Sequence, residues 1–103
     1  MKRLTLLLTG LLMSVQVCAN TVLSPVWSSP AELKTPESVI YDPITKHLYV
    51  SNVNGNPLDA DGNGFISQLS VKGEIEKLHW LDGLNAPKGL ALSGNHLYVS
   101  DSD

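Results

Sequence analysis

The pentapeptide His-Leu-Tyr-Val-Ser occurs twice in this chain, at residues 47–51 and 96–100, with an offset of 49 residues. A proline-headed apolar segment precedes each copy, at residues 36–41 and 87–92, with an offset of 51 residues. The two-residue difference predicts a longer turn in the first copy. Repeats of about 40–50 residues with several short strands are typical of β-propeller blades. The repeat therefore predicts the first blade and the start of the second within residues 35–103.

Short runs of apolar or alternating character, bounded by turn residues, predict the strands of the first copy at residues 39–41, 47–52, 65–70 and 75–80. We expect Asp82-Gly83 and Asn85-Ala86-Pro87 to turn the chain out of the fourth strand and into the next unit. No stretch after residue 20 keeps a helical period. The predicted fold class is therefore all-β.

The N-terminus has the pattern of a secretory signal. Lys2 and Arg3 precede an uncharged stretch at residues 4–17, and Ala19 suits cleavage before Asn20. The apolar run has about fourteen residues, whereas a membrane-spanning helix needs about twenty. Residues 1–19 are predicted to be a cleaved signal, which makes the protein secreted or periplasmic. A retained membrane anchor and a lipoprotein acylated at Cys18 are the alternatives.

The charge of the mature chain limits its partners. All ten acidic side chains lie after the signal, together with five of the seven basic ones, which gives a net charge of −5. This balance, with no basic cluster, argues against nucleic acid and anionic membranes as partners and leaves a small molecule or a protein. Cys18 is the only cysteine, so no disulfide is expected in an oxidising compartment.

Residues 20–34 form a leader that belongs to neither copy of the repeat. Within it, residues 22–27 have strand character. We expect this segment to close a ring by pairing with the last blade. The alternative is a loosely packed leader in which Trp27 covers the edge of the sheet.

Two motifs carry a family resemblance. Pro-Glu-Ser-Val-Ile-Tyr-Asp-Pro at residues 36–43, followed by His-Leu-Tyr-Val-Ser-Asn, resembles the first blade in the gluconolactonase / senescence-marker-protein / LRE-like superfamily of six-bladed propellers. Ala-Pro-Lys-Gly-Leu-Ala-Leu at residues 86–92 resembles a blade opening that is shared with NHL-type propellers. The match covers residues 35–103, about a quarter of such a ring. The fold hosts hydrolases and binding modules alike.

The resemblance implies a divalent cation in the central channel, with a Glu of a Glu-x-Pro-x-Trp motif among its ligands. Glu37 occupies that ligand position here, whereas Val39 and Tyr41 depart from the motif, and Lys88 stands where an Asn could ligate. A carboxylate suits a hard cation. The remaining ligands would lie beyond Asp103. An exposed Glu37 without a metal is the alternative.

A loop rich in Asn, Asp and Gly follows the first His-Leu-Tyr-Val-Ser strand. Asp59, Asp61, Asn63 and Gly64 match the opening of an EF-hand calcium loop. Ser70 replaces the bidentate Glu at the twelfth position and no helices flank the loop, so a true EF-hand is rejected. A looser Ca²⁺ site built from the two aspartates and Asn63 is one hypothesis. The other is a wide surface loop.

The remaining polar residues are interpreted structurally. Asn52 and Asp101 end equivalent strands, and such residues commonly cap a turn by bonding backbone N–H groups; a polar role facing a central channel is the alternative. His47 and His96 open equivalent strands, and His79 suits packing on an outer strand.

The leading functional hypothesis is a gluconolactonase-like propeller that hydrolyses a small lactone or ester with a divalent cation (Ca²⁺, Zn²⁺ or Mn²⁺) polarising the carbonyl. The competing hypothesis is a non-catalytic NHL-type propeller that binds a ligand or a protein. If these residues were the whole product, its sheet faces would lie uncovered, and we would expect aggregation.

Overall fold

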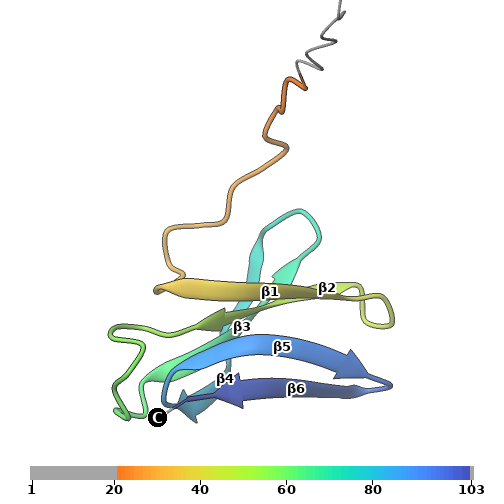
Figure 1. Cartoon of the computed structure of the whole chain (residues 1–103). Coiled ribbons are helices and arrows are strands. Elements are labelled where there is room, and N and C mark those ends of the chain that lie inside the picture. Colours follow the sequence, from red (N-terminus) through yellow and green to blue (C-terminus); the bar gives the residue numbers. More distant parts are fainter. Residues whose placement is uncertain (1–20, 103) are drawn as a thin grey trace, which may run out of the picture.

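The computed structural model describes residues 21–102, which form six strands in two antiparallel sheets (Figure 1). The first sheet has the order β1–β2–β3–β4, with the bounds Pro36–Asp42, His47–Asn52, Gly64–Ser70 and Ile75–Leu84. The second sheet pairs β5 (Pro87–Ser93) with β6 (His96–Asp101). The all-β prediction is confirmed. The predicted signal at residues 1–19, including Cys18, lies outside the described residues.

The two copies of the repeat fold alike. The pairs β1–β2 and β5–β6 share one register, in which Val39 faces Val50 as Leu90 faces Val99. Both pairs also have an irregularity just after the proline that opens the first strand. The sequence repeat is therefore a structural repeat, and we call the first sheet unit 1 and the β5–β6 pair the start of unit 2.

The turns between the paired strands absorb the difference in length. In unit 1 the Asp42 carboxylate accepts the backbone N–H of Ile44 at 2.9 Å and the hydroxyl of Thr45 at 2.8 Å, and Lys46 has a φ of 58°. In unit 2 a two-residue turn has Gly94 at its first position with a φ of 59°. The positive φ there favours glycine. The longer first turn that the offsets predicted is confirmed.

Equivalent serines, Ser51 in unit 1 and Ser100 in unit 2, form hydrogen bonds at the register shift that follows the first proline of each unit. The hydroxyl of Ser51 accepts the N–H of Ser38 at 3.1 Å, and the hydroxyl of Ser100 accepts the N–H of Gly89 at 2.8 Å. Ser51 is fully buried and also donates to the backbone carbonyl of Lys88 in unit 2, at 2.7 Å. The last residue of the recurring pentapeptide therefore links the first strand of one unit to the first strand of the next.

The two units stack face to face, with β5 packed on β1 and β2. We call the side of each unit that holds Ile40 and Tyr49, or their equivalents Ala91 and Tyr98, the forward face. The opposite side is the rear face, which holds Val39, Tyr41, Leu48 and Val50 in unit 1 and Leu90, Leu92, Leu97 and Val99 in unit 2.

Exposure of equivalent residues shows which faces meet. Tyr49 is 5% exposed, whereas its equivalent Tyr98 is 59% exposed. On the rear face the order reverses, because Val39 is 62% exposed while its equivalent Leu90 is half-buried. The forward face of unit 1 therefore packs on the rear face of unit 2, which is a head-to-tail arrangement.

The core of unit 1 lies on both faces of its sheet. On the rear face Leu33, Val50 and Leu69 form a buried cluster. On the forward face the rings of Tyr49 and Trp80 lie 4.8 Å apart. Burial on both faces explains why β2 and β3 are the most buried strands.

The fourth strand is longer than the sequence indicated. It runs to Leu84 instead of ending at Trp80, so the expected turn at Asp82 and Gly83 is wrong. Gly83 has a φ of 83° inside a stretch where the pairing with β3 shifts register. Glycine reaches positive φ without a steric penalty, so it serves here as a bulge in a continuing strand. No helix within residues 21–102 is long and apolar enough to cross a membrane.

Candidate functional site

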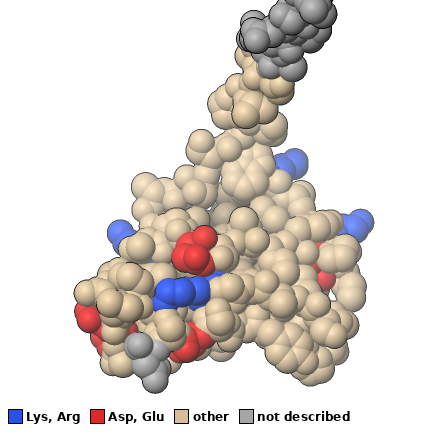
Figure 2. Space-filling model, in the orientation of Figure 1, with Lys and Arg blue, Asp and Glu red and all other residues tan. Residues whose placement is uncertain are grey.

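One end of the molecule gathers most of the polar residues that the sequence singled out. β1 and β5 begin there, β2 and β6 end there, and the loop of residues 53–63 joins β2 to β3 (Figure 1). We call this the loop end. Figure 2 shows acidic and basic side chains close together near it, at the lower left of the view. The loop end is therefore the first candidate site.

Asn52 and Asp101 hold equivalent turns at the loop end. The side-chain oxygen of Asn52 accepts the backbone N–H of Lys34 at 2.9 Å. The carboxylate of Asp101 accepts the N–H groups of Asn85 at 3.0 Å and Ala86 at 2.7 Å. The predicted turn-capping role of the two residues is confirmed.

Unit 2 holds the 53–63 loop at two points. The Lys88 ammonium donates to the carbonyl of Pro57 at 3.1 Å. The backbone N–H of Gly62 donates to the side-chain oxygen of Asn85 at 3.1 Å. These two contacts bracket Asp59 and Asp61, so the position of the acidic part of the loop depends on the second unit. The sequence pattern alone gave no sign of this role for Lys88 and Asn85.

Glu37 and Lys88, which stand at equivalent positions, have different surroundings. Glu37 is exposed near the start of β1, and its carboxylate accepts the hydroxyl of Ser38. Lys88 as a residue is half-buried, and its ammonium also donates to the carbonyl of Ala86 at 3.2 Å and to the hydroxyl of Ser102. Lys88 therefore holds the 53–63 loop against unit 2 through hydrogen bonds, whereas Glu37 presents a carboxylate to solvent.

The loop acids are arranged by local turns. One carboxylate oxygen of Asp61 accepts the backbone N–H of Asn63 at 3.2 Å, and the carbonyl of Asn63 accepts the side-chain amide of Asn54 at 3.0 Å. Asp59, Asp61 and Asn63 are all exposed. This geometry belongs to an ordered surface loop with outward-facing oxygen atoms.

Metal binding depends on which donor groups the structure brings together. Within residues 21–102, no three His, Cys, Asp or Glu side chains gather as a group able to hold a metal ion. The Asn63 amide and backbone carbonyls are oxygen donors outside that set, so Glu37, Asp59, Asp61 and Asn63 stay predicted ligands. Further donors would have to join Glu37 for the cation that the resemblance implies.

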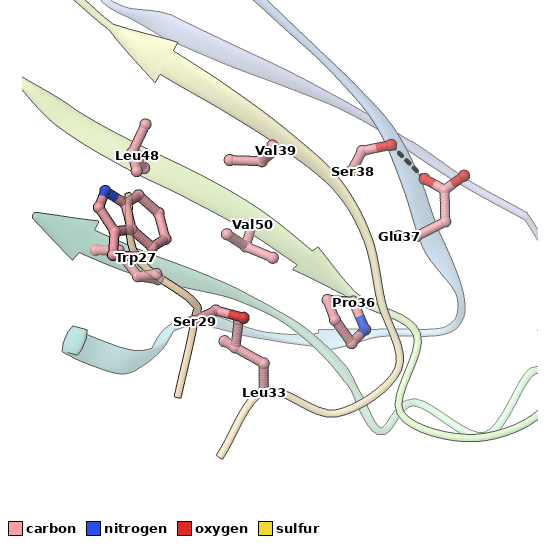
Figure 3. A pocket seen from close by; sticks show the side chains of 10 residues that line it. Trp27, Ser29, Leu33, Pro36, Glu37, Ser38, Val39, Leu48 and Val50 are labelled. Atoms are coloured by element: carbon pink, nitrogen blue, oxygen red, sulfur yellow. Dashed lines mark hydrogen bonds between the residues drawn. The ribbon is translucent and has the colours of Figure 1, made fainter. Parts of the chain in front are cut away.

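A hollow of about 250 Å³ on the rear face of unit 1 is the second candidate site (Figure 3). Val39, Leu48 and Val50 form its floor, and Trp27 and Leu33 of the leader lie across it. Glu37 and Ser38 lie at one end, where the hydrogen bond between them is drawn. The lining is mainly apolar, so this hollow suits an apolar group more than a charged one.

The leader reaches this hollow without forming a strand. Residues 21–30 have no strand pairing, and Val22, Leu23 and Val26 are more than 80% exposed. Trp27 instead packs against Gly73, where an added Cβ would lie 2.5 Å from its ring. Closure of a ring by this segment stays a prediction, since it needs another unit as a partner.

His47 and His79 each contact other residues of unit 1. His47, beside the Asp42 turn, has its Nε2 atom 2.8 Å from the Glu76 carboxylate. His79 lies with its ring centroid 4.1 Å from that of Phe65, and its Nδ1 atom is 2.5 Å from Asp82. Both contacts join neighbouring parts of unit 1, which agrees with the structural interpretation of these residues.

Comparison with family models, curated proteins and solved structures finds no match for this chain.

Proposed function

We propose that this chain forms the first unit and the start of the second unit of a secreted or periplasmic six-bladed propeller of the gluconolactonase-like type. The observation that carries the proposal is the head-to-tail packing of two equivalent units. Each propeller blade packs one face on the preceding blade and the other on the next, and the two units described here make one contact of this kind. The resemblance of residues 35–52 and 86–101 to blade openings supports the same conclusion.

The proposed activity is hydrolysis of a small lactone or ester at the loop end. In a propeller the first strand of each blade borders the central channel, and Glu37 lies near the start of β1 with its carboxylate exposed. A divalent cation, when bound, would polarise the substrate carbonyl. The part that the described residues play is to present the Glu37 carboxylate and to order the neighbouring 53–63 loop.

The test is hydrolysis of a panel of small lactones and esters by the full-length protein, with Ca²⁺, Zn²⁺ or Mn²⁺ and with a chelator. We expect turnover that the chelator abolishes. Turnover should fall at least about 100-fold in Glu37→Gln, because loss of even the outer partners of a metal ligand costs about 10–100-fold in metal affinity or activity. Glu74→Gln, an exposed acid in the β3–β4 turn, is the matched control and should keep full activity. Turnover insensitive to both the chelator and Glu37→Gln would contradict the mechanism.

One observation favours a second candidate function, a non-catalytic propeller that binds a ligand or protein at the loop end. Lys88 and Asn85 hold the 53–63 loop in place through hydrogen bonds, which is how a binding loop is ordered in advance of its ligand. In this case no lactone or ester is hydrolysed. Saturable binding of a small molecule or protein that is weakened by Lys88→Ala would then support the binding function.

A further inference from the structure

The 53–63 loop has an Asn-Gly pair near each end, Asn54-Gly55 at its start and Asn63-Gly64 where it joins β3. The side-chain amide of Asn54 donates to the backbone carbonyl of Asn63 at 3.0 Å. This hydrogen bond closes the base of the loop, and we call it the neck bond. It adds to the two contacts from unit 2 that hold the loop in place.

An Asn-Gly pair can undergo a reaction of its own, because glycine has no side chain to shield its backbone nitrogen. That nitrogen attacks the side-chain carbonyl carbon of the asparagine, a C–N bond forms, and the bond from this carbon to the amide nitrogen breaks. Ammonia leaves with the proton from the glycine nitrogen, and a succinimide ring remains. Water then opens the ring at either of its two carbonyl carbons, which gives aspartate or isoaspartate. The rate depends on how freely the two reacting atoms can meet.

The Asn63-Gly64 pair is held in a way that opposes this ring closure. Gly64 is buried and is paired with Leu84 across β3 and β4. A Cβ placed on Gly64 would clash with Cδ of Pro87 and lie 3.0 Å from the backbone carbonyl oxygens of Leu84 and Asn85. Turning the Gly64 nitrogen toward the Asn63 side chain would therefore break strand pairing and disturb a tightly packed contact.

The Asn54-Gly55 pair has the room that Asn63-Gly64 lacks. Gly55 is exposed with a φ of 128°, and nothing lies within 4 Å of a Cβ placed on it. Its N–H donates to the hydroxyl of Thr35 over a long distance of 3.4 Å. This contact and the neck bond oppose the reaction, and both are exposed, so water replaces them at little cost.

We propose that Asn54 is a site of spontaneous deamidation in the folded protein, and that its conversion to aspartate or isoaspartate opens the base of the 53–63 loop. The product carboxylate accepts hydrogen bonds and cannot donate one to the carbonyl of Asn63, so the neck bond is lost. Isoaspartate also adds a methylene group to the main chain. The contacts from unit 2 at Pro57 and Gly62 then hold the loop without the neck bond.

The proposal goes beyond the proposed function and does not depend on it. Neither a cation nor a substrate takes part in the reaction, which needs only water. Deamidation at Asn54 would therefore continue in Glu37→Gln, and a failure of deamidation would leave the evidence for Glu37 unchanged.

The test measures deamidation of the full-length protein by peptide mass spectrometry during incubation in mildly alkaline buffer. The folded protein is compared with the same protein in urea, where both Asn-Gly pairs lose their surroundings. We expect the folded protein to convert Asn54 at least about tenfold faster than Asn63, and the two rates to become similar in urea. Three results would overturn the proposal: an Asn54 that stays intact in the folded protein, an Asn63 that reacts as fast as Asn54, or the same ratio of rates with and without urea.

Asn54→Asp forms the aspartate product directly and tests the effect on the loop. Asn56→Asp is the matched control, because it adds the same charge to the loop and keeps an acceptor for the N–H of Leu58, now bonded at 2.9 Å. We expect a protease of broad specificity to cleave within residues 53–63 about fivefold faster in Asn54→Asp, as for the loss of one hydrogen bond, and at the unaltered rate in Asn56→Asp.

An unaltered cleavage rate in Asn54→Asp, or equal acceleration in Asn56→Asp, would show that the neck bond does not hold the loop and would overturn the proposed opening. Circular dichroism checks that each variant keeps its strands. If Asn54→Asp loses them, the unaltered chain after incubation, in which Asn54 has been converted, is used for the same cleavage measurement.

Discussion

Asn52 and Asp101 perform the same task in the two units but in different surroundings. Asn52 is fully buried, and its amide nitrogen also donates to the hydroxyl of Ser67 at 3.0 Å and to the carbonyl of Val50 at 3.2 Å. Asp101 is exposed and bonds only to the turn before β5 in the contacts described. The comparison shows that the same turn-capping residue contributes more to the free energy of unfolding where the sheet around it is complete. Water cannot replace a hydrogen bond that is lost from a buried position.

The largest expected effect comes from removing this motif in each unit. Asn52→Leu should lower the free energy of unfolding by about 3 kcal/mol, since several buried groups lose their partners. Asp101→Leu should lower it by less, about 2 kcal/mol, because only the N–H groups of Asn85 and buried Ala86 lose their acceptor and Asn85 is partly open to water. Urea unfolding followed by tryptophan fluorescence at low protein concentration measures both. Equal losses would show that the two motifs contribute alike despite their burial.

A second comparison concerns Gly73 and Gly83, which both have a φ of 83°. Alanine at either position should cost about 1 kcal/mol for the backbone conformation alone. At Gly83 nothing lies within 4 Å of an added Cβ, whereas at Gly73 the Cβ would meet the Trp27 ring. Gly73→Ala should therefore cost about 2 kcal/mol in total, since Trp27 also loses its packing.

The position of Trp27 gives this second comparison its own measurement. In a Trp80→Phe background, the emission of Trp27 should shift to longer wavelength in Gly73→Ala and stay unchanged in Gly83→Ala. An unchanged spectrum in both variants would mean that Trp27 does not rest on the β3–β4 turn in solution.

The smallest expected effect is a pH dependence of the unfolding free energy that comes from the turn of unit 1 and not from the turn of unit 2. The N–H of Ile44, and then the hydroxyl of Thr45, hold the pKa of the Asp42 carboxyl below its ordinary value of 3.8. A group whose pKa is lowered by folding adds stability above its unfolded pKa and loses that contribution as pH falls. We therefore expect the contribution of Asp42 to be complete at neutral pH and to decline below pH 3.8.

Asp42→Asn provides the control for the pH dependence, since it removes the titrating group. Its unfolding free energy should fall less steeply below pH 3.8 than that of the unaltered chain. Ser93 takes the place of Asp42 in unit 2, so Ser93→Ala should keep the steep decline. If the unfolding free energies of Asp42→Asn and the unaltered chain changed in parallel with pH, the pH dependence would not come from the Asp42 carboxyl.

The strands could be predicted because their evidence is local. Alternation along residues 47–52 and 65–70 was enough to place β2 and β3. The longer turn followed from the two repeat offsets, which are 51 residues at Pro36 and 49 residues at His47. The end of β4 was misjudged because Gly83 is typical both of a turn and of a bulge in a continuing strand. Only the pairing with β3 decides between them.

The contacts between units could not be predicted, because they join residues far apart in the sequence. Alternation shows that Tyr49 and Val50 lie on opposite faces, but not that unit 2 covers one face and the leader the other. In the same way, nothing near Lys88 indicates that its ammonium reaches the carbonyl of Pro57. For the candidate site, the interpretation of Asn52 and Asp101 as turn-capping residues was correct, while the role of Glu37, Asp59, Asp61 and Asn63 as cation ligands stays a prediction.

The four-residue turn after Asp42 has a practical use. Unit 1 has two more residues there than unit 2, yet the strands on both sides keep the same pairing. Exposed turns of this kind tolerate insertions. A short epitope or a dye-binding peptide placed between Ile44 and Thr45 would label the end of the molecule opposite to the loop end, beside the hollow that these two residues share with Leu92 and Asn95 of unit 2.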